Sequence, residues 1–256
     1  MSVAACAELV QRGDPDRFLA VMAAPPAARA VLFPLYAFNL EVARAPWVAS
    51  EPMIAEMRLQ FWRDVAEEIG QGATPRAHEV AAPLAGVVRG EDAGLLDALA
   101  AARRWDIYRD PFEDEAHLAD YIDATSGNLA VVAARALGAE AGAEAALRDM
   151  AWGAGIAALF RAVPELEARG RVPLLDGRPD GVRALAERAL ARFRRGKAGQ
   201  GALPRKARAA VYAFWQTEAL LKLAVADPAR VGDGRLATSE FARRGKLLLV
   251  SMTGRL

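Results

Sequence analysis

Apolar residues recur along most of the chain at the three- and four-residue spacing of amphipathic helices. The segment that follows Pro52 is a clear case, and Gly70 and Gly72 end it. Ser50, just before it, is expected to cap the first turn, because a serine oxygen accepts hydrogen bonds from first-turn N–H groups. We expect one buried face made of Met53, Ile54, Met57, Phe61, Trp62, Val65 and Ile69.

Similar periods predict helices near residues 27–45, 76–89, 92–109, 113–137, 140–162, 180–196, 204–226 and 237–251. No segment alternates polar and apolar residues convincingly enough to predict a strand. Pro34 removes one backbone hydrogen bond and is expected to bend the helix that contains it. Two segments break the pattern, Arg169 to Gly181 and the glycine-rich Gly196 to Pro204. The sequence predicts an all-α fold in a single domain over residues 1–256.

Composition narrows the class of protein. Apolar residues make up 54% of the 256 residues, which argues against disorder. Lys and Arg total 33 against 32 Asp and Glu, a balance that argues against a dedicated nucleic-acid binder. The single cysteine, Cys6, cannot form an internal disulfide. The start resembles no signal peptide and no apolar run is long enough to cross a membrane, so we expect a soluble, intracellular protein.

Two sequence motifs match the patterns of a dinucleotide-binding site and a metal site, but the residues around them favour other interpretations. Gly153 to Ala158 reads GAGIAA and fits the G-x-G-x-x-A pattern of dinucleotide binding. That pattern needs a preceding strand, but Arg148 to Trp152 is typical of a helix, so we expect small residues that allow close helix packing. Glu113, His117 and Asp120 have the spacing of three metal ligands on one helix face. The favoured alternative is that acids in a first turn complement the helix dipole.

Basic segments near the carboxyl end suggest surface contacts. Arg183 to Arg208 holds many cations and the single acid Glu187. It could face anionic lipid, an acidic protein or nucleic acid, but a solvated helix face beside a flexible loop is favoured. The tail FARRGKLLLVSMTGRL is basic and then apolar, and we favour a packed terminal helix over a membrane-interface helix. His78 stands alone, and no Ser or Cys has a nearby base that would suggest a catalytic triad.

Three stretches resemble the squalene/phytoene synthase family. They are DRFLAVMAAPPAARAVLFPLYAF from Asp16, YIDATSGNLAVVAARALG from Tyr121 and AGIAALFRAVPELEARGRVPLL from Ala154. The resemblance covers about Asp16 to Asp176 in one register. It implies the isoprenoid-synthase fold of a trans-prenyltransferase, a helical bundle around a central cavity.

The acids that active members of the family use are mostly replaced here. Carboxylates on two helices of those enzymes hold Mg²⁺ ions that neutralise a departing diphosphate. The resemblance places their D-D-x-x-D motif at Ala43, Arg44 and Trp47. Glu41 is no substitute, because two residues rotate it about 200° around the helix. The second motif, N-x-x-x-D-x-x-E-D, falls on Ala158, Ala162, Glu165 and Leu166. Only one carboxylate remains, so no catalytic residue and no metal ligand is expected.

A closer likeness lies in AFNLEVARA and in MRLQFWRDVAEEI from Met57. These two stretches resemble the family branch that contains the mitochondrial respiratory complex I assembly factor and lacks the double acid motif. The resemblance implies a pseudoenzyme that assembles or scaffolds a respiratory complex, with a subunit or assembly intermediate as protein partner. A composition rich in Ala, Arg and Gly, without a transit peptide, suggests a bacterial, cytoplasmic relative. The assembly role adds the expectation of a peripheral contact at the inner membrane face.

Two other functions stay open. One is a prenyl diphosphate transferase with altered ligands such as Glu165, Glu113 or Asp120, which alone would need Mg²⁺ as cofactor. The other is a lipid- or isoprenoid-binding module. The residues expected to line the cavity or a partner surface are Tyr36, Asn39, Glu41, Gln60, Trp62, Tyr121, Asn128 and Arg161. Arg44 and Trp47 belong to residue types that are enriched at interface hot spots.

Overall fold

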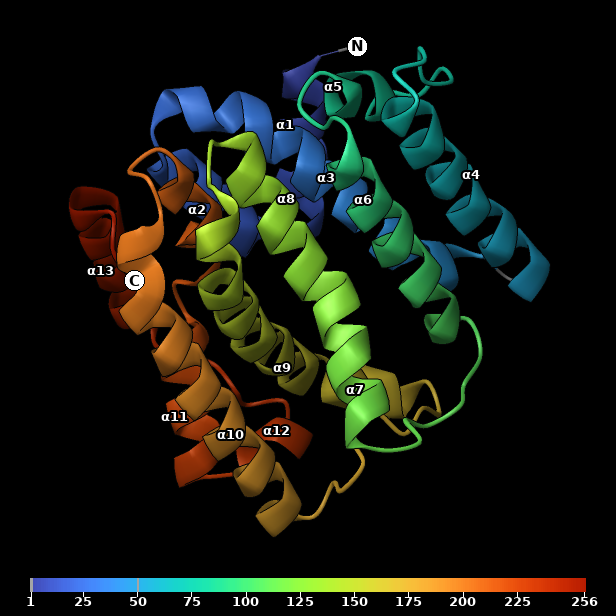
Figure 1. The fold of residues 1–256 in the computed structure, drawn as a ribbon. Coiled ribbons are helices and arrows are strands. Elements are labelled where there is room, and N and C mark those ends of the chain that lie inside the picture. Colours follow the sequence, from blue (N-terminus) through green and yellow to red (C-terminus); the bar gives the residue numbers. More distant parts are fainter. Residues whose placement is uncertain (1, 50) are drawn as a thin grey trace. The chain divides into compact units, whose positions relative to one another are not determined.

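Helices form all the regular structure of residues 2–49 and 51–256, the part of the chain that the computed structural model describes (Figure 1). No strand occurs in these residues, so the predicted all-α class is confirmed. Ser50, the expected cap, lies outside the described residues. The chain divides into two compact units, each built from segments that are distant in sequence.

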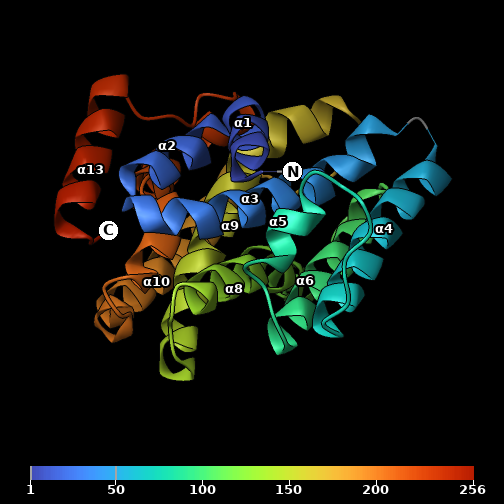
Figure 2. The same cartoon turned by 90° about the horizontal axis from the view of Figure 1, so that it is seen from above.

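The first unit comprises Met1–Tyr108, Asn128–Glu140 and Leu203–Ala213. Within it α3 packs against α1, α4 and α8, and α4 runs beside α6 (Figures 1 and 2). Its described elements are α1 (Val3–Gly13), α2 (Pro15–Ala23), α3 (Pro26–Val48), α4 (Pro52–Gly70), α5 (Ala81–Ala85), α6 (Glu91–Ala102), the 3-10 turn η1 (Arg103–Asp106), α8 (Asn128–Ala136) and most of η5 (Ala207–Phe214).

The buried face of α4 differs from the predicted stripe at its amino-terminal end. Met53 and Met57 are 72% and 67% exposed and Ile54 is exposed as well, so their prediction as core residues is wrong. A strict four-residue repeat advances about 400° per step, so it drifts about 40° around the helix each time. Between Met53 and Ile69 the drift sums to roughly 160°, which puts the two residues on opposite faces. The residues that are buried are Ala55, Leu59, Trp62, Val65, Ala66 and Ile69.

The second unit comprises Arg109–Gly127, Ala141–Ala202 and Phe214–Leu256. Its centre is α9, which packs against α10, α11, α12 and a π-helical turn, η2. Its elements are α7 (Glu115–Ile122), η2 (Asp123–Gly127), η3 (Ala141–Ala143), α9 (Glu144–Ala168), α10 (Pro179–Ala198), η4 (Gly199–Ala202), α11 (Thr217–Ala226), α12 (Ala229–Gly232) and α13 (Glu240–Thr253).

Glycines set the distance between α9 and its neighbours. A Cβ on Gly153 would lie 2.7 Å from Cβ of Phe193, and one on Gly155 would lie 2.6 Å from a methyl group of Ile122. On the facing helix, a Cβ on Gly196 would lie 2.5 Å from the main-chain oxygen of Ala146. The GAGIAA motif therefore lies inside one long helix and allows close packing, as its sequence context predicted.

The predicted helix boundaries hold in some segments and not in others. The segment 76–89 contains only the five-residue α5, which Gly86 follows. The segment 113–137 is helical without a break from Glu115 to Ala136, as predicted, with Asp114 as its cap and the π-helical turn η2 between α7 and α8. The glycine-rich Gly196 to Pro204 was expected to be a flexible loop. Instead, α10 extends to Ala198 and the 3-10 turn η4 follows it directly.

A cluster of cations around Glu218 joins α10 to α11 in the second unit. Arg194, Lys197 and Lys222 place nitrogens 3.4, 2.8 and 2.9 Å from the Glu218 carboxylate. Burial raises the pKa of Glu218, but the hydrogen bonds and charges of Lys197 and Lys222 outweigh burial and lower that pKa to about 2. Glu218 therefore stabilises the fold as an anion.

Replacing Glu218 with glutamine is expected to lower the free energy of unfolding by on the order of 1–2 kcal/mol at neutral pH. The loss should shrink as the pH falls from the ordinary glutamate value of 4.5 towards about 2, where Glu218 itself is protonated. Denaturant unfolding of both proteins across that range measures the difference. A difference that does not change with pH would contradict the ionic origin.

Candidate functional site

The first candidate segment lies on α3, in the first unit, whose carboxyl-terminal half carries the positions that resemble the family's first acid motif. Ala43 and Trp47 are half-buried there, and Arg44 is exposed. Glu41 is also half-buried, on a different face of the helix from Ala43. α3 therefore presents a cation and an aromatic ring where a metal-binding helix would need carboxylates.

Two polar residues of α3, Tyr36 and Asn39, are buried inside the first unit. The Tyr36 hydroxyl donates a hydrogen bond to the main-chain oxygen of Ala210 at 3.3 Å, and the Arg17 guanidinium lies 5.3 Å from the centre of its ring. Burial raises the pKa of Tyr36 to about 12 in spite of Arg17, so the hydroxyl stays a hydrogen-bond donor. Burial excludes direct contact of either residue with a protein partner, and their position on a cavity wall stays a prediction.

A separate candidate segment lies on α9, within the second unit, at the positions that resemble the family's second acid motif. Ala158 and Glu165 are exposed, whereas Ala162 and Leu166 are half-buried. The Glu165 carboxylate accepts a hydrogen bond from Arg169 at 2.6 Å, one turn further along the helix. The one remaining carboxylate of the motif therefore already has a cation as its partner.

These residues do not fit the Mg²⁺ ions that the fold family implies. Magnesium binds oxygen ligands, chiefly carboxylates, with near-octahedral geometry. Alanine, leucine and tryptophan supply no such ligand, and Arg44 adds positive charge. Across residues 2–49 and 51–256, no three His, Cys, Asp or Glu side chains gather closely enough to hold a metal ion.

The alternative metal site at Glu113, His117 and Asp120 does not form. Glu113 precedes α7, which starts at Glu115, so the three residues do not share one helix face. Asp114 instead caps this helix, because its carboxylate accepts a hydrogen bond from the main-chain N–H of His117 at 2.8 Å. The acids of this segment therefore cap the helix and complement its dipole, as the favoured alternative predicted.

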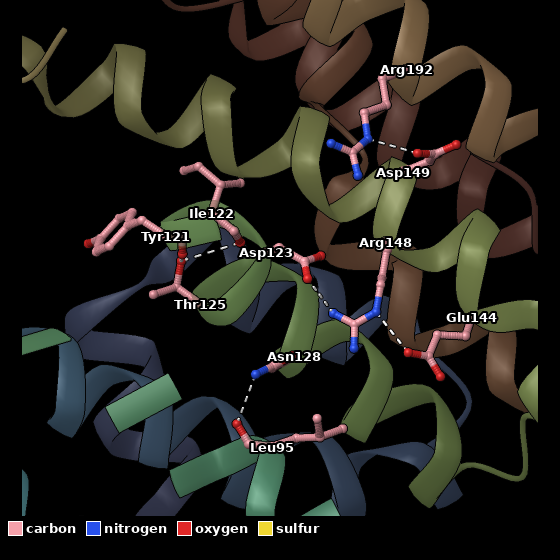
Figure 3. A network of polar contacts seen from close by, with 10 residues as sticks. All are labelled: Leu95, Tyr121, Ile122, Asp123, Thr125, Asn128, Glu144, Arg148, Asp149 and Arg192. Atoms are coloured by element: carbon pink, nitrogen blue, oxygen red, sulfur yellow. Dashed lines mark hydrogen bonds and ion pairs between the residues drawn. The ribbon is translucent and has the colours of Figure 1, made fainter. Parts of the chain in front are cut away.

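A polar network surrounds η2 in the second unit (Figure 3). Arg148 of α9 donates to Asp123 at 2.9 Å and to Glu144 at 2.8 Å. The Thr125 hydroxyl of η2 donates to the main-chain oxygen of Tyr121, in the last turn of α7, at 2.7 Å. The half-buried Tyr121 ring packs against Phe112 at 5.5 Å. Arg148 ties α9 to η2 through Asp123, and we interpret the network as a structural support for η2.

The other expected site residues fall into two groups. Trp62 and Asn128 are buried in the first unit, where Trp62 packs against Phe38 at 5.4 Å and Asn128 donates to the main-chain oxygen of Leu95 at 3.2 Å (Figure 3). Gln60 is exposed, like Arg161 of the second unit, and it borders a groove of about 380 Å³ between α4 and α6. Burial thus removes Trp62 and Asn128 from any partner surface.

An exposed apolar patch at the start of α4 was missed by sequence reasoning. Met53 and Met57 lie on it, with Ile54 40% exposed beside them and Val48, at the end of α3, 48% exposed. We call these four residues the α3–α4 patch. Methionine is flexible and polarizable, and it is frequent at surfaces that bind proteins. A helical projection at 3.6 residues per turn, instead of a strict four-residue repeat, was the signal that could have found it.

The cations between Arg183 and Ala202 are largely neutralised by acids of other elements. Arg188 contacts Glu115 at 2.7 Å, and Arg192 and Arg195 both contact Asp149, at 2.8 and 2.7 Å. The arrangement supports the favoured interpretation of this stretch as a solvated helix face with ion pairs.

The all-helical structure matches the terpene-synthase-like fold of solved synthases. A dehydrosqualene synthase crystallised with a ligand superimposes with a TM-score of 0.80 at 13% identity, over 98% of this chain and 95% of that one. Squalene synthase HpnC from Alicyclobacillus acidocaldarius gives 0.72 at 17% identity, over 87% and 92%. At these identities the likeness shows the fold alone.

The chain belongs to the squalene/phytoene synthase family, whose family model matches residues 10–174. It is similar to the Drosophila melanogaster homolog of NADH dehydrogenase (ubiquinone) complex I assembly factor 6, with 29% identity over 66% of this chain and 53% of the relative. The Homo sapiens assembly factor 6 is 38% identical over 25% of this chain and 19% of its own length. The chain thus spans about half of the fly relative and about a fifth of the human one.

Proposed function

We propose that this chain is a non-enzymatic member of its family that acts as an assembly factor for respiratory complex I. The observation that carries the proposal is the replacement of both acid motifs, by Ala43, Arg44 and Trp47 on α3 and by Ala158, Ala162 and Leu166 on α9. Support for the partner comes from the human relative, which is named complex I assembly factor 6, and from the fly relative, which is named its homolog.

Electrostatics supports the absence of catalysis. Ionisation of a prenyl diphosphate needs divalent cations to stabilise the charge of the leaving group. The α3 positions offer the cation Arg44, and Glu165, the one carboxylate that α9 keeps, is paired with Arg169. Neither segment therefore offers the group of carboxylates that would recruit those cations. A transferase with other ligands would need a new carboxylate cluster, and the described part of the chain has none.

The partner surface is placed, as part of this proposal, on the first unit at Arg44 and the α3–α4 patch. Arginine and exposed methionines are residue types enriched at protein interfaces. Among the described residues, no helix combines the length and apolar character needed to span a membrane. We propose a cytoplasmic protein that meets its partner at the inner membrane face.

Complementation of a deletion strain tests the proposal. Cells that lack the gene should contain less assembled NADH:ubiquinone oxidoreductase, measured on native gels and as NADH oxidation by membranes. The wild-type gene and a Glu165→Gln variant should restore it equally, because the proposed role needs no carboxylate chemistry. Normal levels of the complex in the deletion strain, or failure of a folded Glu165→Gln protein to restore it, would contradict the proposal.

A further inference from the structure

Helix α13 of the second unit exposes most of its apolar side chains. Phe241 is 90% exposed, Met252 77%, Leu248 61% and Leu249 53%, while Val250 is the residue of this helix that is fully buried. At about 100° per residue, the four exposed side chains fall within an arc of roughly 100°. They therefore form one continuous apolar face, which we call the α13 face.

Polar contacts attach the opposite side of α13 to the rest of the second unit. The Arg243 guanidinium lies 5.9 Å from the centre of the Trp215 ring, and it shares that side with Val250. After the helix, Gln200 of η4 donates to the main-chain oxygen of Gly254 at 3.4 Å and accepts from the N–H of Leu256 at 3.3 Å. Figure 1 shows α13 beside the carboxyl-terminal end of α10. The inward side of α13 thus combines Val250 with the cation Arg243, while most of the apolar side chains of the helix face outward, unlike those of a usual amphipathic helix.

Cations border the α13 face on both sides. Arg244, whose side chain is 81% exposed, lies about 40° beyond Leu248, and Lys246 lies about 60° beyond Leu249. The helix carries three cations and one acid, Glu240. Burial and then the positive charge of Lys197 lower the pKa of Lys246, so the Glu218 cluster described above lies close to it.

These charges decide among the occupants that could cover the face. A second copy would bring the positive borders of two identical helices together, which like-charge repulsion disfavours. An anionic bilayer offers hydrocarbon to the apolar arc and phosphates to the cations at its borders. A basic helix with Phe and Leu on its apolar face is typical of helices that lie in a membrane interface.

We propose that α13 is an interfacial helix that lies on an anionic lipid surface, with Phe241, Leu248, Leu249 and Met252 in the acyl boundary and Arg244 at the headgroups. This inference rests on α13 alone and holds whether or not the chain assembles a respiratory complex. The sequence favoured a packed terminal helix; in the structure α13 packs through Val250 while Phe241, Leu248, Leu249 and Met252 stay exposed.

Flotation of the full chain with vesicles tests the inference. Wild-type protein should float with phosphatidylglycerol–phosphatidylcholine vesicles, and much less with phosphatidylcholine alone. A Phe241→Ser, Met252→Ser variant should partition on the order of tenfold more weakly, because both side chains are exposed and act only at the interface. An Arg244→Gln variant should lose affinity for the anionic vesicles only, and added salt should have the same effect.

The matched control is Met53→Ser, Met57→Ser, which removes two side chains of similar exposure from the first unit. It should float like the wild type. Failure of the wild type to float, equal loss in this control, or equal affinity for neutral vesicles would overturn the inference. Light scattering could instead show a concentration-dependent dimer that the α13 variant abolishes. The α13 face would then bind a second copy of the chain and not lipid. A soluble acidic protein partner would be indicated if vesicles fail while a pure polyanionic protein binds.

Discussion

Replacing Gly196 with alanine is expected to lower the free energy of unfolding by about 2–3 kcal/mol, because the new methyl group meets main-chain atoms. A Cβ at this position would lie 2.5 Å from the oxygen of Ala146 and 2.8 Å from the nitrogen of Met150. Neither atom belongs to a flexible side chain, so α9 and α10 would have to move apart. Chemical denaturation followed by circular dichroism measures the change.

A second glycine provides the control for this prediction. Gly94 lies exposed within α6, and a Cβ there would meet no atom within 4 Å. Gly94→Ala should therefore raise the free energy of unfolding by about 0.5–1 kcal/mol, through the lower chain entropy of alanine. If both variants shifted stability in the same direction, the close approach of α9 and α10 would not be what restricts Gly196.

The second large effect concerns the α3–α4 patch. Met53→Ser with Met57→Ser is expected to reduce co-purification of identified complex I subunits at least about tenfold, since exposed apolar anchors dominate interface energies. The melting temperature should hardly change, because both side chains are largely exposed. Quantitative mass spectrometry of affinity-purified protein from its own cells measures the loss. Arg44→Ala should weaken the same association.

The α13 variant Phe241→Ser, Met252→Ser serves as the reciprocal control for this experiment. It should bind the detergent-solubilised subunits like the wild type, although it no longer binds lipid. Retained co-purification in the methionine variant would remove the patch from the partner surface. Loss in both variants would mean that the association depends on the membrane and not on the patch.

Periodicity predicted the class of the fold and most of its helices. It predicted less well which face of each helix is buried. The residues Trp62, Val65 and Ile69 are buried as expected, because they lie close together in sequence and drift is small. Met53 lies four steps of the repeat from Ile69, and there the accumulated drift reverses its orientation. Burial of Val250 alone in α13 likewise depends on contacts with distant segments that periodicity does not include.

The helical register of the candidate residues was predictable where one helix carries them. The register of Ala43, Arg44 and Trp47 follows from α3, and that of Glu165 and Leu166 follows from α9. Interactions between distant segments were not predictable, such as the ion pair of Arg148 with Asp123 or the contact of Tyr36 with Ala210. Single-sequence patterns contain local spacing, whereas these pairs depend on how helices cross.

The central claim is that this chain lacks the chemistry of its family. The most direct test is to measure diphosphate release from a prenyl diphosphate in the presence of Mg²⁺. Purified protein with farnesyl or geranylgeranyl diphosphate should release no diphosphate above a control without protein, while a dehydrosqualene synthase in the same assay does. Glu165→Gln should change nothing. Release above the control that Glu165→Gln abolishes would contradict the claim and identify the chain as a transferase.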